Sequence, residues 1–397
     1  MKLSLCAIVL NEEESLSRCL ESVGDVVDEM VVLDTGSRDR TIEIAKKEGA
    51  RVYSFQWGND FAAARNEALR YARGEWVLVL DADEVLNPKI IPQLKEAIAN
   101  EDYLLINLLR QEVGATQSPY SLTSRLFRNR PELEFSHPYH AMVDDSVVAL
   151  VEKEPRWKVV SLPSLAIFHY GYQPETIAAK SKFKRARESM EAFLATHPDD
   201  AYTENKLGAL YLQEGRFQEG IQLLESALTK KQIDAPVLFE IHYHLGNGYA
   251  RLSNPNKAVR HYQEAIAQPI LPQLKLGAYN NLGGLLQAAG EYQLAEKIYK
   301  EALKIDPNFA IAHYNLAMTY KAIGNFKEAI AACEASIRLN PDRGSAYQNL
   351  GVIWLKCGNF AKSEEAFKKA IALHQQRNPQ EAQRLRQELQ AIGFSNL

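Results

Sequence analysis

Cysteine is scarce in this chain of 397 residues, which contains four. Cys6 and Cys19 lie far in the sequence from Cys333 and Cys357, and none of them forms a C-x-x-C pair. This spacing argues against a disulfide framework and against a structural zinc site. We expect all four thiols to be reduced and buried, as is typical of a cytoplasmic protein.

Long apolar runs are also missing. No segment approaches the roughly 20 apolar residues that are needed to span a bilayer. Residues 1–10 superficially resemble a signal peptide, but the segment Asn-Glu-Glu-Glu at residues 11–14 follows without a small-residue cleavage site. We therefore interpret the beginning of the sequence as a buried strand and expect no transmembrane segment.

The chain has no strong excess of charge of either sign. Its formal net charge is −4, so we expect neither a nucleic-acid partner nor binding to a strongly anionic membrane. Apolar residues make up 46% of the sequence and charged residues 24%, which is an ordinary globular composition. The length suits two or three domains.

The first half alternates short apolar runs with segments of helical pattern. Four apolar runs predict strands, at residues 3–10, 29–33, 51–55 and 76–80. Three predicted helices separate them, at residues 14–23, 39–48 and 61–71. This alternation predicts an α/β domain with a Rossmann-like, mostly parallel sheet that is covered on both faces.

The second half repeats with a period near 34 residues. Leucine and glycine recur at this interval in three successive copies: Leu282, Leu316 and Leu350, with Gly290, Gly324 and Gly358. Two earlier copies, which contain Leu207 and Leu245, fit with short insertions between them. The pattern resembles the tetratricopeptide repeat (TPR), a helix pair with small residues where the helices touch. One pair cannot bury its apolar face alone, so we expect the repeats to stack into an all-α solenoid.

These patterns predict four parts along the chain. The α/β domain spans residues 1–173, and a helical linker spans residues 174–200. Five TPR-like repeats follow at residues 201–376, and a C-terminal capping helix lies within residues 377–397.

Polar residues follow three of the predicted strands. Asn11 and Glu12 come after the first strand, Asp34 ends the second, and Asp81 and Asp83 come after the fourth. Ligands of open α/β sheets bind beyond the carboxyl ends of the strands. We therefore expect these side chains to share one pocket, because a solvated loop explains one such cluster better than three.

Asp81 and Asp83 form the sharpest element of this set. Two carboxylates that leave an apolar strand together can bind one divalent cation, Mg²⁺ or Mn²⁺, which commonly shares its coordination with substrate phosphates. The alternative is a solvated surface loop, because an isolated D-x-D is common. Asp34 could accept the ring N–H of a nucleotide base or act as a turn residue ahead of Gly36. Arg65 could contact a phosphate or be a surface arginine.

Four segments, in this order, resemble the successive motifs of the family 2 glycosyltransferases, which have the GT-A fold. They are residues 7–12 (Ala-Ile-Val-Leu-Asn-Glu), 32–37 (Val-Leu-Asp-Thr-Gly-Ser), 65–68 (Arg-Asn-Glu-Ala) and 80–84 (Leu-Asp-Ala-Asp-Glu). The match is close over about residues 1–100 and looser to about residue 175. It implies inverting transfer of a sugar from a nucleoside-diphosphate sugar, with a divalent metal.

The same resemblance implies roles for individual residues. Asn11 and Glu12 would line the nucleotide pocket, and Asp34 would contact the base. Asp81 would face the ribose or the metal, and Asp83 would bind the metal.

Inversion by direct displacement also needs a general base. Relatives often carry a His-Glu pair where this chain has His140 followed by alanine, so the expected acidic residue is missing. Asp144 or Asp145 could supply the carboxylate. We favour Asp144, and the alternative is a hairpin turn with two solvated aspartates.

Two further side chains of this half are candidates for the site. His169 lies in a segment that resembles the histidine-bearing strand end of such enzymes, where it would bind the metal or the diphosphate. A satisfied core histidine is the alternative. Arg125 is a candidate contact for the acceptor or a phosphate, although such residues are more often surface charges.

The repeats suggest how an acceptor is recognised. Asparagines recur near the same part of successive first helices, at positions 205, 247, 280, 281, 315 and 349. They could grip an extended peptide or only fill a polar helix groove. The pairing of these repeats with the first domain resembles a bacterial group of such enzymes, and this resemblance implies a peptide, a protein or a glycan of the lipopolysaccharide type as acceptor. The repeats would bind the acceptor or a partner protein. A lipid-linked acceptor would be met at the inner face of the membrane, so peripheral association stays open.

Two rival interpretations remain. A nucleotidyltransferase usually has a basic, Gly-rich loop after the first strand, where this chain is acidic. A non-catalytic TPR scaffold with a vestigial sugar-nucleotide domain is disfavoured by the intact Asp81 and Asp83.

Overall fold

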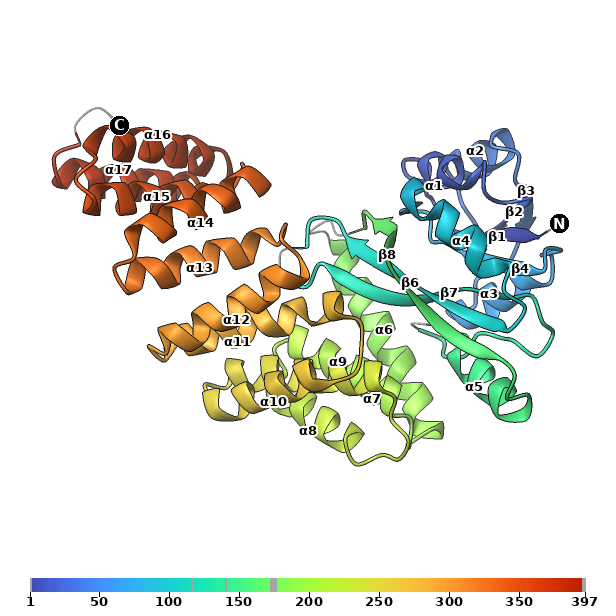
Figure 1. Cartoon of the computed structure of the whole chain (residues 1–397). Coiled ribbons are helices and arrows are strands. Elements are labelled where there is room, and N and C mark those ends of the chain that lie inside the picture. The colour runs from blue at the N-terminus through green and yellow to red at the C-terminus, as the bar shows by residue number, and fades with distance from the viewer. Residues whose placement is uncertain (1, 116, 140, 172–176, 395–397) are drawn as a thin grey trace. The chain divides into compact units, whose positions relative to one another are not determined.

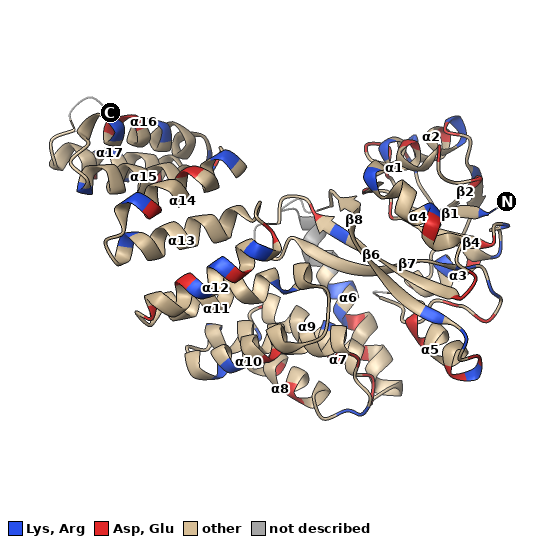
Figure 2. Cartoon of the chain, viewed as in Figure 1, with Lys and Arg blue, Asp and Glu red and all other residues tan. Residues whose placement is uncertain are grey.

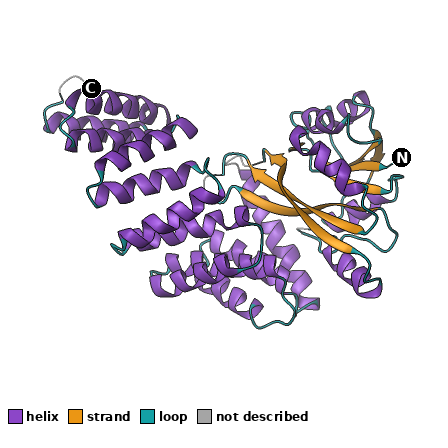
Figure 3. Cartoon of the chain, viewed as in Figure 1, coloured by secondary structure: helices purple, strands orange, loops and turns teal. Residues whose placement is uncertain are grey.

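The computed structural model describes residues 2–115, 117–139, 141–171 and 177–394. The chain forms two compact units, Met1–Val237 and Leu238–Leu397. All strands of the described residues lie in the first unit, and the second unit is helical (Figure 3). The predicted α/β domain and helical array are therefore both present, and the division into compact units at Val237 falls within the predicted repeats.

A mixed sheet of eight strands organises the first unit, in the order β3-β2-β1-β4-β7-β6-β8-β5. The strands are β1 (Leu3–Val9), β2 (Glu29–Asp34), β3 (Arg51–Ser54), β4 (Trp76–Val79), β5 (Glu84–Leu86), β6 (Tyr103–Glu112), β7 (Tyr120–Arg128) and β8 (Lys158–His169). The helices are α1 (Leu16–Val23), α2 (Thr41–Lys47), α3 (Phe61–Leu69), α4 (Ile91–Ile98), α5 (Asp144–Lys153), α6 (Ile177–Thr196), α7 (Ala201–Gln213) and α8 (Phe217–Ala227).

The sheet has a parallel part and a mixed part. Strands β1 to β4 are parallel to one another, as the alternation of strands and helices predicts. Strand β7 then runs antiparallel to both β4 and β6, and β5 runs antiparallel to β8. The long strands β6, β7 and β8 lie side by side (Figure 1). Polar residues on these strands lie near the carboxyl end of β4, as Arg125 of β7 does where it binds Asp81.

Both faces of the parallel strands are buried. On β1, Leu3, Leu5 and Val9 belong to one apolar cluster with α1 and α4. Cys6, between them, belongs to a second cluster with residues of α3 and α5. The alternation of strand side chains assigns successive residues to opposite faces, which explains why β1 is apolar along its length except for the buried Ser4.

The helical array consists of pairs. The remaining helices are α9 (Ala235–Arg251), α10 (Pro255–Ala267), α11 (Leu276–Ala288), α12 (Tyr292–Ile305), α13 (Ala310–Ala322), α14 (Phe326–Leu339), α15 (Gly344–Lys356), α16 (Phe360–Arg377) and α17 (Pro379–Ala391). Helices α7 to α16 make five consecutive pairs, and α17 follows as the last helix. The exposed faces carry charges of both signs, as along α12 (Figure 2), where Lys300 pairs with Glu296 and Lys304 with Glu301.

Two findings concern the scarce cysteines and the missing long apolar runs. Cys6, Cys19 and Cys333 are buried, but Cys357 is exposed at the end of α15, so the expectation that all four thiols are buried is wrong. Cys357 lies where the chain leaves the helix, beyond the surface that contacts neighbouring helices. Among the described residues, no helix combines the length and the apolar character that crossing a membrane requires.

Close approach of the two helices in a repeat depends on glycine. A Cβ atom on Gly283 would lie 2.6 Å from a ring carbon of Tyr299 on the partner helix, whereas one on Gly284 would meet that residue only at 3.9 Å. Gly246 faces Tyr262, and Gly351 faces Phe367, in the same way. Each of these three closely packed glycines directly follows a leucine of the repeat pattern, whereas the recurring Gly290, Gly324 and Gly358 have positive φ and end the first helix of a pair.

We predict that Gly283→Ala destabilises the array by about 1–3 kcal/mol, because the new methyl group overpacks the contact with Tyr299. Gly284→Ala is the matched control on the same helix. It should be neutral or stabilising by up to about 1 kcal/mol, because alanine has the higher helix propensity. Urea unfolding of both variants measures the difference, and equal midpoints would contradict the packing argument.

Candidate functional site

The loops after β1 and β2 are tied together at the carboxyl edge of the sheet. The Asn11 side chain accepts a hydrogen bond from the Arg38 N–H at 2.8 Å, and the Glu12 N–H donates to Thr41 Oγ1 at 2.7 Å. Asn11 has a φ of +55°, a left-handed conformation that asparagine tolerates better than most residues. Burial and the nearby charges of Asp83 and Asp81 raise the pKa of Glu12. The charges of the D-x-D segment therefore act on Glu12, and a pocket shared by these side chains stays a prediction.

Asp34 ends β2 and is 3% exposed. Its two carboxylate oxygens accept the N–H groups of Gly36 at 3.0 Å and Ser37 at 3.1 Å. The side chain thus stabilises the turn that follows β2, which was the alternative to a base contact. The base contact stays a prediction.

Asp81 lies between two arginines. One oxygen accepts from Arg65 Nη2 and the other from Arg125 Nη2, each at 2.8 Å. Burial raises the pKa of Asp81, but the two guanidinium groups outweigh it and hold this pKa well below its ordinary value. The carboxylate is therefore permanently ionised and fixed in direction.

The Arg65 side chain is buried and does not extend into solvent. It is 7% exposed, and its guanidinium lies 5.3 Å from the ring of Phe135. Within the described part of the chain, its Nε and Nη1 atoms have no hydrogen-bonding partner. The reading of Arg65 and Arg125 as surface charges is wrong, because the Asp81 carboxylate draws both guanidinium groups inward. Direct contact of either with a phosphate stays a prediction.

A second chain of ion pairs lies behind Asp81, and three of its members were not singled out in the sequence. Glu84 is fully buried, accepts the Asp81 N–H at 2.9 Å, and pairs with Arg110 at 2.7 Å. Arg110 also pairs with Glu112 at 2.8 Å. Their signal in the sequence was weak but present, because Arg110 and Glu112 are the charged residues at the end of the mainly apolar strand β6.

His169 connects this chain of ion pairs to Asp83. Its Nε2 donates to Asp83 Oδ2 at 3.2 Å, and its Nδ1 donates to Glu112. Antiparallel pairing of β5 with β8 sets His169 opposite Glu84 and so beside the D-x-D segment. Burial lowers the pKa of His169, but the two carboxylates more than compensate and raise it to about 10. The histidine thus lies among ionised groups and not in an apolar core.

Gly171 permits this approach. A Cβ atom at Gly171 would lie 2.2 Å from Asp83 Oδ2 and 2.7 Å from His169 Nε2. Any larger residue would fill the space beside the two polar atoms. Gly171 was not singled out in the sequence, because its role depends on a tertiary contact.

The predicted general-base candidates lie at the start of α5. Asp144 and Asp145 form its first turn, where the helix dipole favours acidic residues, so the alternative of a hairpin turn is wrong. Ser124 Oγ donates to Asp144 Oδ1 at 2.7 Å. Burial raises the pKa of Asp144 to about 6, and its Oδ2 has no partner among the described residues. The third candidate, His140, lies outside the described residues.

Two neighbouring residues of β7 hold the two sides of this site. Ser124 binds Asp144, and Arg125 binds Asp81. One strand therefore fixes the position of the predicted general base relative to the D-x-D segment.

Comparison with known proteins gives the family. The family described as Glycosyl transferase family 2 matches residues 4–160, and tetratricopeptide repeat families match segments between residues 178 and 382. A TPR repeat-containing protein of Synechococcus elongatus is 42% identical over 306 residues, which cover 77% of this chain and 76% of that protein. The chain belongs to the family 2 glycosyltransferases. It joins their catalytic domain to TPR repeats.

Other relatives of this family 2 glycosyltransferase match its first half. The SPbeta prophage-derived glycosyltransferase SunS of Bacillus subtilis is 29% identical over 49% of this chain and 45% of that protein. An uncharacterized glycosyltransferase of Rickettsia bellii is 28% identical over 48% of this chain and 67% of that protein. A glycosyl-transfer role combined with TPR repeats follows from these matches.

Solved structures resemble the helical part only distantly. MamA from Desulfovibrio magneticus is 20% identical, with a TM-score of 0.40, over 45% of this chain and 98% of that one. YrrB, described as a TPR protein with an unusual peptide-binding site, is 19% identical, with a TM-score of 0.41, over 51% of this chain and 99% of that one.

The asparagines of this glycosyltransferase's repeats bind one another. Asn281 donates to Asn247 at 2.9 Å, and Asn315 donates to Asn280 at 2.8 Å. These contacts join neighbouring repeats and agree with polar filling of the helix groove. Gripping of a peptide stays a prediction.

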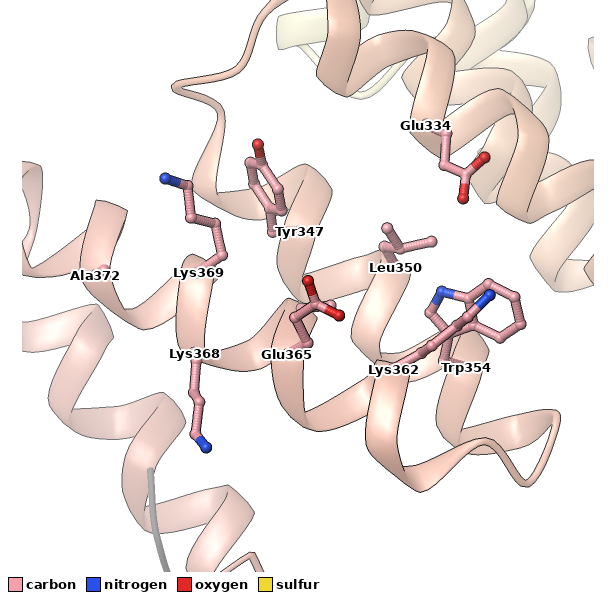
Figure 4. Close-up of a pocket in the computed structure, with 10 residues that line it drawn as sticks. Glu334, Tyr347, Leu350, Trp354, Lys362, Glu365, Lys368, Lys369 and Ala372 are labelled. Carbon is pink, nitrogen blue, oxygen red and sulfur yellow. The ribbon is translucent and has the colours of Figure 1, made fainter.

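A cavity of about 700 Å³ lies elsewhere in the second unit, among α14, α15 and α16 (Figure 4). Tyr347, Leu350 and Trp354 of α15 line it, together with lysines of α16. The Lys362 ammonium lies 4.4 Å from the centre of the Trp354 ring, within the range of a cation–π contact. The repeats therefore contain a cavity that is lined by both aromatic and charged side chains.

We predict that Gly171→Ala lowers glycosyltransferase activity by at least about tenfold, because the methyl group separates Asp83 from His169 and misplaces both. Gly58→Ala is the control, since a Cβ atom there meets nothing within 4 Å. Donor hydrolysis and the melting temperature are measured for both variants. Equal activities would show that the space beside Asp83 is not used.

Proposed function

We propose that this chain is an inverting glycosyltransferase that moves a sugar from a nucleoside-diphosphate sugar to a peptide, protein or glycan acceptor. The main support is that His169 and Gly171 lie beside Asp83, the second aspartate of the D-x-D segment. This grouping offers one carboxylate and one imidazole at the edge where α/β sheets bind ligands.

These residues suit a resident Mn²⁺ or Mg²⁺ ion. Asp83 and His169 would hold it, and Glu112 fixes the imidazole through its other nitrogen, as carboxylates do in many metal sites. No group of three or more His, Cys, Asp and Glu side chains suited to one metal ion occurs in the described part of the chain. This agrees with ions that keep positions for water and substrate phosphates. When bound, the cation would neutralise charge on the leaving diphosphate.

Nucleotide binding is assigned to the loops that end the parallel strands. We propose that Asn11 and Glu12 line the pocket and that Asp34 receives the base at the turn after β2. Asp81 would face the ribose. Arg65 and Arg125 support this role because they fix the Asp81 carboxylate before the donor arrives, so little ordering is left for binding.

Asp144 is the proposed general base. Ser124 orients one carboxylate oxygen and leaves the other without a partner in the described structure. A base with a pKa of about 6 is mostly ionised at neutral pH and still accepts a proton readily. Asp145 is the competing candidate, and its side chain is 60% exposed.

The repeats are proposed to bind the acceptor or a partner protein. The hollow formed by Tyr347, Leu350 and Trp354 supports this, since aromatic side chains are common at binding hot spots. A polypeptide acceptor would suit a solenoid because its extended surface can contact many residues of a chain.

We predict that Mn²⁺ together with the correct sugar nucleotide raises the melting temperature, in a screen of nucleoside-diphosphate sugars. A ligand at about 100 times its Kd adds about 2.7 kcal/mol to stability. Asp83→Ala should lose this shift and the metal-dependent hydrolysis of the donor. Asp25→Ala, which removes an exposed carboxylate near the opposite edge of the sheet, is the control.

Two results of that screen would count against the proposal. Equal shifts and equal hydrolysis in Asp83→Ala and the unmodified protein would show that Asp83 does not bind the metal. No shift with any sugar nucleotide would favour a non-catalytic scaffold.

A second prediction concerns pH. The base must be ionised, so kcat/KM should rise with pH through about 6, the pKa of Asp144. Asp144→Asn should lower kcat by about 10²–10⁴-fold and abolish this rise. Asp145→Asn should keep the rise. The reverse pattern in the two variants would transfer the role to Asp145.

A further inference from the structure

The acceptor-side segment contains a strained and buried histidine. His137 is 5% exposed and has a φ of +67°, a left-handed conformation that few non-glycine residues adopt. Such a conformation persists only where the surrounding contacts hold it, and it is common at functional sites. The segment that contains His137 leads directly to Asp144 and Asp145.

The contacts of His137 extend in two directions. Its Nε2 lies 3.3 Å from Asp200 Oδ2, just before the first TPR helix. Its Nδ1 lies 2.9 Å from Ser136 Oγ, which donates to Asp145 in the first turn of α5. The imidazole therefore links the first repeat to the helix that carries the proposed base.

Asp200 has two roles at this junction. It is the N-cap of α7, and its other oxygen accepts the Thr203 N–H at 2.6 Å. The same carboxylate thus begins the first repeat helix and holds His137. Rings of Phe193 and Tyr202 lie 4.9 Å and 5.2 Å from the imidazole, so helices on both sides of Asp200 enclose it.

Two other contacts join the first repeat to the acceptor side. Tyr139 packs on an apolar cluster of α6 and α7 that includes Met190 and Leu207. At the far end of the repeat, Asp234 is close enough for its charge to raise the pKa of Asp144 further, in addition to burial. These contacts explain why the first repeat belongs to the same compact unit as the catalytic domain.

We propose that His137 is a positioning residue through which the first repeat fixes the acceptor-side segment and thereby the placement of Asp144. The inference rests on the proposed role of Asp144 in catalysis. The first repeat then acts as a structural part of the catalytic domain, and the later repeats are the ones free to serve partners.

The test compares His137→Asn and Asp200→Asn with Asp199→Asn. Asparagine tolerates the left-handed conformation at position 137 and keeps the N-cap at position 200, so both variants remove the link with little other change. Asp199 is the control, because its side chain is 94% exposed. Hydrogen–deuterium exchange of the amides at residues 133–139 and 141–146 should become at least about fivefold faster in the two test variants. It should stay unchanged in the control.

The kinetic arm uses Mn²⁺-dependent hydrolysis of UDP-glucose, with water as the acceptor. Both test variants should lose about tenfold in kcat with an unchanged donor KM, because the link positions the base and not the nucleotide. The double variant should be no worse than either single variant, since both remove one link. A merely structural role would instead lower the melting temperature and leave kcat per folded molecule unchanged.

The two arms separate the possible failures. Unchanged exchange in both test variants overturns the inference, whatever the activity. Faster exchange with unaltered kcat also overturns it, because the segment then moves without consequence for catalysis. Lack of hydrolysis in the unmodified protein would count against UDP-glucose as donor, while the exchange result still decides whether His137 holds the segment.

Discussion

The candidate site depends on the neutralisation of carboxylates by arginines at the carboxyl edge of the sheet. Buried charges are tolerated when they are paired, and removal of one partner leaves an uncompensated charge. Arg65 and Arg125 fix Asp81, and Arg110 joins Glu84 to Glu112. Because these groups are already bound to one another, Asp83 and His169 at the open end are held in a defined geometry before any ligand binds.

This arrangement combines two kinds of strand pairing. The parallel strands β1, β2 and β4 deliver the loops with Asn11, Asp34 and Asp81 to one edge. The antiparallel pairing of β5 with β8 adds His169 to them. Gly171 then packs closely against Asp83 and His169, where a larger residue would collide with both side chains. The side chains of such a site are held rigidly before a ligand binds, which favours precise placement of a reacting group.

The helical array follows a simpler physical rule. In each of several repeats a glycine on the first helix faces a large side chain on the second, as Gly283 faces Tyr299. The first repeat differs because it also packs on the acceptor-side segment through Tyr139 and His137. Because the first repeat packs on this segment, it belongs to the first compact unit, and the division between the units falls after it.

The sequence by itself determined the fold class, the family and the five helix pairs, because these depend on local periodicity and on motifs that are contiguous in the chain. It also gave the strand ends at which Asp34, Asp81 and Asp83 lie. Only the tertiary structure decided that Arg65 and Arg125 pair with Asp81, that Glu112 binds His169, and that His137 meets Asp200. Those contacts join residues 16 to 63 positions apart, and no local pattern records which side chains a folded sheet and helix bring within hydrogen-bonding distance.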